Sequence, residues 1–226
     1  MRASAASVDA ALSGVEMFAA LDSEVRARVA AASRLRTFRR GQFIFGQDDP
    51  GDSLLVVAEG RAKVVVRTAD GGELLLTVVA AGDTVGELSI VDGGTRSADA
   101  ETLKDTTVVF VPREVLLQLL RTEPSVAEHI LRIMAATLRR LTEATADLVF
   151  LDLPRRVAKV LLEHPRTAHG TVDLGLTQSD LAHRVGATRQ SVNASLRTLE
   201  RRGWITVDGQ TIVINQVEAL SRYAVR

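Results

Sequence analysis

A glycine-rich stretch over residues 86–98, GELSIVDGGTRSA, brings an acid, an arginine and a hydroxyl close together. Glycines let a backbone approach a ligand closely, and exposed N–H groups in such a turn attract an anion. Arg96 adds a planar, permanently charged fork that suits a phosphate, and Ser97 can donate a further hydrogen bond. Glu87 would repel a phosphate, but its carboxylate can accept a hydrogen bond from a sugar hydroxyl. The stretch therefore predicts a ligand that presents a phosphate and a ribose edge together.

The plainer alternative is a surface hairpin with scattered charges. The full order is more specific: Gly-Glu-Leu-Ser-Ile, a short loop, then Arg-Ser-Ala resembles the phosphate-binding cassette of cyclic-nucleotide-binding domains. The resemblance implies that Glu87 accepts from the ribose 2′-hydroxyl and that Arg96 and Ser97 bind the cyclic phosphate. It adds Gly86 and Leu88 to the residues that contact the ligand.

Short apolar runs separated by turn signals surround this stretch. They lie at residues 42–45, 53–57, 62–66, 73–79 and 106–111, with Gly, Asp or Pro between them. Regularly spaced short strands predict an antiparallel sandwich or barrel, and Asp70-Gly71 between two of the runs predicts a hairpin. Before the strands, residues 12–33 carry apolar side chains at helical spacing and predict one or two short helices, while residues 1–11 read as a frayed, cytoplasmic end.

A long helix is predicted to begin at Glu123-Pro124-Ser125, because proline suits a first helical turn. Its apolar residues fall into two rows seven residues apart, with alternating steps of four and three, and charged residues flank them. This spacing indicates a coiled-coil seam between two copies of the chain; the alternative is a helix packed on its own domain. The predicted seam comprises Ile130, Met134, Thr137, Leu141, Ala144 and Leu148, with Leu151 continuing the second row.

Two short helices around Gly186 predict a helix-turn-helix. Asp152 is expected to cap a helix that precedes this motif and runs from Arg155 to Glu163. Thr177 and Asp180 have the spacing of a capping box for the first helix of the motif. Gly203 suits the end of the last helix. Residues 204–207 and 211–214 predict a hairpin wing. The outward side of the second helix carries the residues expected to meet DNA, which are Thr188, Arg189, Gln190, Asn193 and Arg197.

The segment LTQSDLA…GATRQSVN…LERRGWI resembles the winged DNA-binding domain of the Crp/Fnr family, the cyclic-AMP receptor protein and fumarate-nitrate regulator family. The resemblance then covers nearly the whole chain in the order of that family's domains. It implies an α+β chain: a β-roll cyclic-nucleotide-binding domain at 1–123, a dimerisation helix and hinge at 124–153, and a winged helix-turn-helix at 154–226. It further implies a homodimer, a near-palindromic DNA operator, RNA polymerase as a partner, and no membrane.

Composition narrows the alternatives. The chain has no cysteine, which excludes disulfides, Cys-ligated iron–sulfur clusters and thiol redox sensing. No histidine precedes His129, so a haem sensor, a jelly-roll metal oxygenase and a hydrolytic triad in the roll all lack their histidine. We therefore expect no catalytic residue, no metal and no bound cofactor.

Residues 154–226 hold 11 basic and 6 acidic side chains, a net charge of +5, whereas residues 1–123 hold 14 basic and 18 acidic side chains, a net charge of −4. A basic block in an otherwise acidic chain favours a polyanion as partner of that block.

Departures from the family pattern leave the effector open. When residues 150–152 are aligned with the end of the family's helix, Thr142 keeps one of two hydroxyls that the best-known members place against adenine, and Leu141 loses the other. In the second helix of the helix-turn-helix, Gln190 replaces the usual Glu, and Ala194 stands where a basic residue is common. The prediction is a regulator controlled by cyclic AMP, with cyclic GMP as the other nucleotide. A regulator of the same family that needs no nucleotide, or that answers to another small effector, is the alternative.

Overall fold

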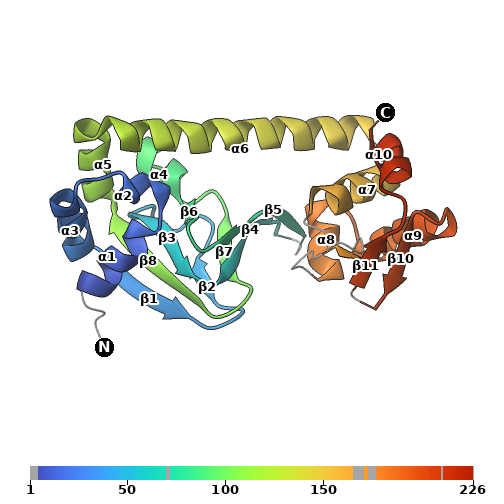
Figure 1. Cartoon of the computed structure of the whole chain (residues 1–226), viewed down its shortest axis with the longest axis horizontal. Helices are drawn as coiled ribbons and strands as arrows, with labels where there is room; N and C mark the ends of the chain where they lie inside the picture. The colour runs from blue at the N-terminus through green and yellow to red at the C-terminus, as the bar shows by residue number, and fades with distance from the viewer. Residues whose placement is uncertain (1–4, 70–71, 165–170, 173–176, 210, 226) are drawn as a thin grey trace. The chain divides into compact units, whose positions relative to one another are not determined.

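The computed structural model describes residues 5–69, 72–164, 171–172, 177–209 and 211–225, which form two compact units, 1–136 and 137–226 (Figure 1). The first unit is an antiparallel β-roll with flanking helices and the second contains a winged helix-turn-helix, so the predicted fold class is confirmed. The predicted hairpin turn at Asp70-Gly71 and the loop at 165–170 lie outside the described residues.

Residues 5–11 are helical, which corrects the prediction of a frayed end for that part of residues 1–11. These residues belong to α1 (Ala5–Ser13), where Val8 and Leu12 are buried against the roll. The sequence did not predict this helix because its residues are mostly small and only Val8 and Leu12 are buried. Two further helices follow, as predicted for residues 12–33: α2 (Glu16–Ala19) and α3 (Ser23–Ala32).

Two four-stranded antiparallel sheets form the roll (Figure 1). One has the order β1 (Arg34–Phe38), β8 (Thr106–Pro112), β3 (Ser53–Glu59) and β6 (Thr84–Val85). The other has the order β2 (Phe43–Phe45), β7 (Asp99–Thr102), β4 (Arg61–Arg67) and β5 (Glu73–Ala80). The five predicted strands are present. β1, β6 and β7 were not predicted, because their short segments lack a continuous apolar run.

Strand β3 is buried on both faces and joins two cores. Leu54 and Val56 pack among the helices, whereas Leu55 and Val57 point into the space between the sheets. Strand residues alternate between faces, so a fully apolar run marks a strand covered on both sides.

Two helices follow the roll: α5 (Arg113–Thr122) and α6 (Pro124–Phe150). The sequence predicted α6 but not α5, whose Leu116 and Leu119 are buried in the helical core. Glu123 separates the two helices and accepts backbone hydrogen bonds from Val126 and Ala127, so α6 begins where the proline predicts.

The second unit adds a helical core and a small sheet. Its elements are α7 (Leu153–Glu163), β9 (Thr171–Val172), α8 (Gln178–Arg184), α9 (Arg189–Arg201), β10 (Ile205–Asp208), β11 (Thr211–Ile214) and α10 (Val217–Ala224). The predicted cap of α7 is confirmed, because the carboxylate of Asp152 accepts from the backbone N–H of Arg155 at 3.0 Å. β9 pairs with β11, which makes the predicted two-stranded wing part of a three-stranded sheet.

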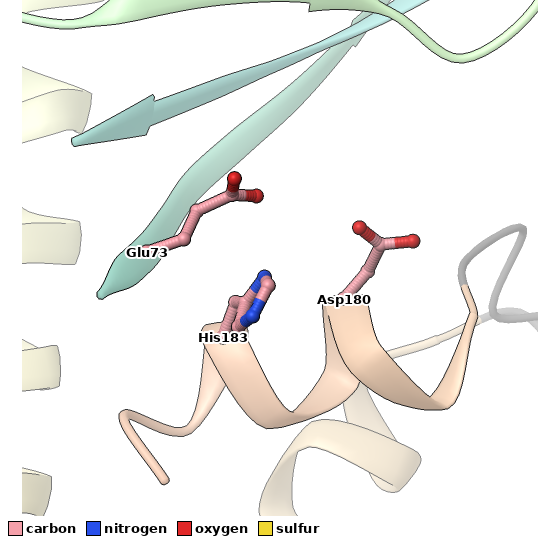
Figure 2. Close-up of side chains that lie close together, drawn as sticks. All are labelled: Glu73, Asp180 and His183. Atoms are coloured by element: carbon pink, nitrogen blue, oxygen red, sulfur yellow. The ribbon is translucent and has the colours of Figure 1, made fainter. Parts of the chain in front are cut away.

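A network of five charged side chains lies on strands β4, β5 and β7. Arg67 reaches Glu73 at 3.0 Å, Asp99 at 2.8 Å and Glu101 at 2.6 Å, and Lys63 reaches Glu73 at 2.7 Å. Figure 2 draws Glu73, which lies on β5 of the first unit, and Asp180 and His183, which lie on α8 of the second unit. Burial raises the pKa of Glu73, but the hydrogen bonds and charges of Lys63 and Arg67 outweigh burial and hold this pKa below its ordinary value of 4.5.

This network predicts an acid-sensitive contribution to stability. A carboxylate whose pKa is lower in the folded state stabilises the fold above the ordinary pKa, and that contribution is lost as the pH falls through the lower folded pKa. We expect Glu73→Gln to lower the free energy of unfolding at pH 7 and to flatten its decline from about pH 5 to about pH 3. The exposed pair of Glu24 with Arg28 provides the control, since Glu24→Gln should leave the curve unchanged. Parallel urea titrations of the three proteins would contradict this expectation if all the curves coincided.

Candidate functional site

The glycine-rich segment 86–98, here called the cassette, is built around a short helix, α4 (Glu87–Asp92), and not around a turn as predicted. Gly86 precedes it with a φ of 91° and Gly93 follows it with a φ of 74°. Both values lie in the left-handed region, which glycine adopts without strain. The glycines therefore serve to start and end one and a half turns of helix.

Arg96 is buried, with 4% of its surface exposed. Its Nη1 donates to the carbonyl of Gly86 at 3.1 Å and to Oγ of Ser89 at 2.9 Å. Its Nη2 donates to the carbonyl of Ser53 at 2.6 Å and lies 3.4 Å from the hydroxyl of the same serine. The guanidinium thus joins α4 to the start of β3.

The Nε atom of Arg96 is buried and has no hydrogen-bond partner. The guanidinium carbon lies 4.6 Å from the centre of the Phe45 ring, close enough for a cation–π contact. No carboxylate within the described residues forms an ion pair with Arg96. Burial lowers the pKa of Arg96, and the charges of Asp52, Asp49 and Glu87 only partly oppose this. A buried cation with an unused N–H donor is a favourable place for an anion.

Two glycines make room for this arrangement. A Cβ on Gly86 would lie 2.2 Å from Nη1 of Arg96. A Cβ on Gly51 would lie 2.2 Å from Cβ of Ser89 and 2.7 Å from the carbonyl of Gly94. Any larger residue at either position would displace the guanidinium or α4.

The remaining predicted ligand residues lie around Arg96. Glu87 is 9% exposed in the first turn of α4, Leu88 is 40% exposed, and Ser97 is exposed directly after the arginine. The backbone of Arg96 is fixed on both sides, because its N–H donates to Asp49 and its carbonyl accepts from Asp48, each at 2.9 Å. Thr142 lies on α6, is exposed, and donates to the carbonyl of Leu138 at 2.9 Å.

The second candidate surface is the helix-turn-helix formed by α8 and α9. The capping box at the start of α8 is confirmed: the Asp180 carboxylate accepts from the Thr177 backbone at 3.0 Å, and Thr177 Oγ1 accepts from the Asp180 N–H at 3.2 Å. Figure 2 shows Asp180 and, one turn later on the same helix, the half-buried His183. Gly186 takes a left-handed φ of 64°, and Thr188 caps α9 through the N–H of Ser191 at 3.2 Å.

The two faces of α9 differ as predicted. Val192, Leu196 and Leu199 are buried in the core of the unit. Of the predicted DNA-contacting residues, Asn193 is half-buried and the others are exposed: Thr188, Arg189, Gln190 and Arg197. An exposed polar face over an apolar one is the arrangement by which a second helix can enter the major groove.

The wing follows α9 closely. Gly203 has a φ of 72°, and β10 and β11 pair in register from Ile205 with Ile214 to Asp208 with Thr211. Arg202 lies 4.8 Å from the centre of the Trp204 ring and 5.0 Å from that of Tyr223, and these contacts link the end of α9 to α10.

Comparisons with known proteins identify the domains in which these two groups of residues lie. Residues 35–123 match the model for a cyclic nucleotide-binding domain, and residues 155–223 match the Crp-like helix-turn-helix domain. A CRP-like cAMP-activated global transcriptional regulator from Mycobacterium tuberculosis is 39% identical over 194 residues, covering 83% of this chain and 86% of that protein. The cyclic AMP receptor protein of Thermus thermophilus is 31% identical over 192 residues, covering 84% and 87%. The structure of FixK2 from Bradyrhizobium japonicum has a TM-score of 0.73 at 24% identity, covering 84% and 96%, which supports the fold.

The chain belongs to the Crp/Fnr family of transcription regulators. Its two domains and its relatives are those of regulators and not of enzymes. Across the described residues, no helix is long and apolar enough to cross a membrane.

On helix α6 of this Crp/Fnr regulator, most residues of the predicted seam are exposed or half-buried: Met134, Thr137, Leu141, Ala144 and Leu148. Ile130 is the exception. Ile130 is 3% exposed and packs in the core of its own unit, and Met134 packs partly against the same core. Ile130 is therefore unavailable for a seam between two copies. The largest exposed apolar side chains on the helix are Leu131, Leu138, Leu141, Leu148, Val149 and Phe150.

Three residues that contact the guanidinium of Arg96 were not singled out from the sequence: Ser53, Phe45 and Ser89. Ser89 lies inside the cassette, and its helical spacing from Gly86 would have been the available signal. Ser53 and Phe45 are more than forty positions from Arg96 along the chain, so only the fold brings them to it.

Proposed function

We propose that this Crp/Fnr regulator is a homodimer that binds cyclic AMP and, in response, a near-palindromic DNA site. The observation that carries the proposal is the buried Arg96 with its unpartnered Nε–H. Such a group requires compensation, and a cyclic phosphate supplies a negative charge and several acceptors at once.

Glu87 and Ser97 suit the rest of the nucleotide. A nearly buried carboxylate one residue after Gly86 can accept from the ribose 2′-hydroxyl, while the exposed Ser97 can donate to the phosphate. Two relatives described by their names as responding to cyclic AMP support this nucleotide over cyclic GMP. A structural neighbour from Xanthomonas campestris is described as responsive to c-di-GMP at 24% identity and a TM-score of 0.75, so the fold by itself admits another effector.

Arg96→Leu should weaken the binding of cyclic AMP at least about tenfold, because a charge-assisted contact contributes roughly 1.5–3 kcal/mol. Glu87→Ala should also bind more weakly. Arg39→Leu, which removes an exposed arginine of the same unit, is the control and should bind normally. Calorimetric titration with cyclic AMP and then cyclic GMP measures each protein and ranks the nucleotides. Equal affinity of the wild type and Arg96→Leu would refute the cassette assignment.

For the dimer, we propose a seam along α6 with rows at Leu131, Leu138, Thr145 and at Met134, Leu141, Leu148. Both rows repeat every seven residues and lie three or four residues apart, the geometry of a coiled coil. The second row is the predicted one. The first lies one position further along than the predicted row of Ile130, Thr137 and Ala144. Thr142 flanks this seam, where it could reach a nucleotide held by the partner copy and so couple the ligand to the arrangement of the two chains.

Leu138→Glu should convert the dimer to monomers, because it places a charge in the apolar seam. Leu138 is 66% exposed in the single chain, so the substitution should not disturb the fold of its own unit. Arg139→Glu changes the neighbouring exposed position on the same helix and should leave the dimer intact. Light scattering at micromolar concentration gives the mass of each protein. A monomeric wild type would contradict the seam, and so would a Leu138→Glu protein that remains a dimer.

For DNA, we propose that the N-terminal end of α9 enters the major groove. Arg189, one residue after the cap, is the proposed bidentate contact to guanine, and Gln190 is the proposed contact to adenine or cytosine. Thr188 and Arg197 are proposed to contact phosphates, and Asn193 lies on the same helix between Gln190 and Arg197. A two-fold dimer then requires half-sites about one helical turn apart. RNA polymerase is the proposed protein partner of the DNA-bound regulator.

Arg189→Ala should cost about 1–3 kcal/mol on the specific site and leave non-specific binding nearly unchanged. Arg197→Ala, a matched loss of one positive charge on the same helix, should weaken binding to all sequences alike and reduce its salt dependence. Selection from a random duplex pool, followed by binding assays at two salt concentrations, separates the two effects. An asymmetric set of selected sequences, or an Arg189→Ala protein that selects the same motif with equal affinity, would refute this mode of binding.

A further inference from the structure

The hydroxyl of Ser89 connects the start of α4 to the guanidinium of Arg96. Its Oγ accepts from Nη1 of Arg96 at 2.9 Å and donates to the carbonyl of Gly86 at 3.1 Å. Ser89 is 2% exposed, so water cannot readily replace either contact. One hydroxyl therefore uses both of its hydrogen-bonding capacities on groups that border the nucleotide site.

The five N–H donors of Arg96 are used unevenly. The two on Nη1 face Gly86 and Ser89, at 3.1 and 2.9 Å. Those on Nη2 face Ser53, where the carbonyl is close at 2.6 Å and the hydroxyl distant at 3.4 Å. The Nε–H has no partner. The Nη1 end is thus held by protein, whereas the edge formed by Nε and Nη2 keeps one unused donor and one weakly used donor.

Packing confines Ser89 to this position. A Cβ on Gly51 would lie 2.2 Å from Cβ of Ser89 and 2.5 Å from its Oγ, so the loop before β3 lies directly against this side chain. The loop is itself fixed, because Pro50 pairs with Thr95 and the carbonyl of Asp49 accepts from the N–H of Arg96. Ser89 cannot move aside without moving the segment that carries the arginine.

We propose that Ser89 is a positioning residue for the phosphate: it holds the Nη1 end of Arg96 so that the Nε–Nη2 edge meets the ligand side-on. The inference rests on the proposed nucleotide site and adds the orientation in which its arginine binds. A side-on contact uses the unpartnered Nε–H and displaces only the long contact to the Ser53 hydroxyl. An end-on contact through Nη1 would instead break the bonds to Ser89 and Gly86.

Ser89→Ala removes the acceptor and leaves one Nη1 hydrogen unpaired, so the guanidinium is held less firmly, by the carbonyls of Gly86 and Ser53. We expect cyclic AMP to bind about fivefold more weakly or worse, which corresponds to the loss of one buried hydrogen bond. A guanidinium held in one orientation should also distinguish the two phosphorothioate diastereomers of cyclic AMP, in which sulfur replaces one or the other exocyclic oxygen. Ser89→Ala should therefore reduce the ratio of their affinities, which a general loss of stability would not do. Ser89→Cys, which keeps a side chain but offers only a weak sulfur acceptor, should behave in the same way.

Thr102→Val is the matched control, because Thr102 is a buried hydroxyl of the same unit that bonds to Arg39 and Gln42 and not to the cassette. It should lower the melting temperature without changing the affinity or the diastereomer ratio. A wild type that binds no nucleotide would refute the proposed function. If the wild type binds cyclic AMP and the Ser89 variants have the same affinity and the same diastereomer ratio as the wild type, the inference about Ser89 is refuted and the proposed function stands. A weaker affinity with an unchanged ratio would also overturn it, since Ser89 would then act only on stability.

Discussion

The burial of one guanidinium constrains the design of the cassette. A cation removed from water must be compensated, and no carboxylate among the described residues pairs with Arg96. Its charge is instead shared among the carbonyls of Gly86 and Ser53, the hydroxyl of Ser89 and the ring of Phe45. These acceptors are neutral, and the nearby charges of Asp52, Asp49 and Glu87 offset the burial of the cation only in part. An anionic ligand can therefore add the negative charge that these contacts do not provide.

This requirement explains the local backbone. A carbonyl can reach Nη1 only if Gly86 takes a left-handed conformation without a side chain, and α4 can approach the loop before β3 only if residue 51 is glycine. The short length of α4 follows from the same geometry, because Gly93 ends the helix before the chain returns to Arg96. Gly86 and Gly51 therefore have steric reasons that follow from the position of Arg96 and Ser89.

On helix α6, packing in the core distinguishes between two possible seams that the sequence fits equally well. Its apolar residues fit two different pairs of rows, which share Met134, Leu141 and Leu148 and differ by one position in the other row. Burial of Ile130 in the core of its own unit takes the first residue out of one row, whereas Leu131 and Leu138 of the alternative row are exposed. An apolar side chain that is two-thirds exposed on a long helix gains free energy when a second copy covers it, which is the physical basis of the proposed seam.

The sequence by itself determined the class of fold, the helix-turn-helix and the identity of the charged cassette residues, because those signals are local. Caps at Asp152, Thr177 and Thr188 depend on residues three positions away, and strand runs depend on alternation along a few residues. The tertiary structure decided what depends on distant contacts: the helix at the N-terminus, the strands β1 and β7, the exposed rows of α6, and the partners Ser53 and Phe45 of Arg96. Whether a residue is apolar or polar does not determine which distant segment packs against it. Only the folded chain brings Phe45 on β2 and Ser53 on β3 to Arg96.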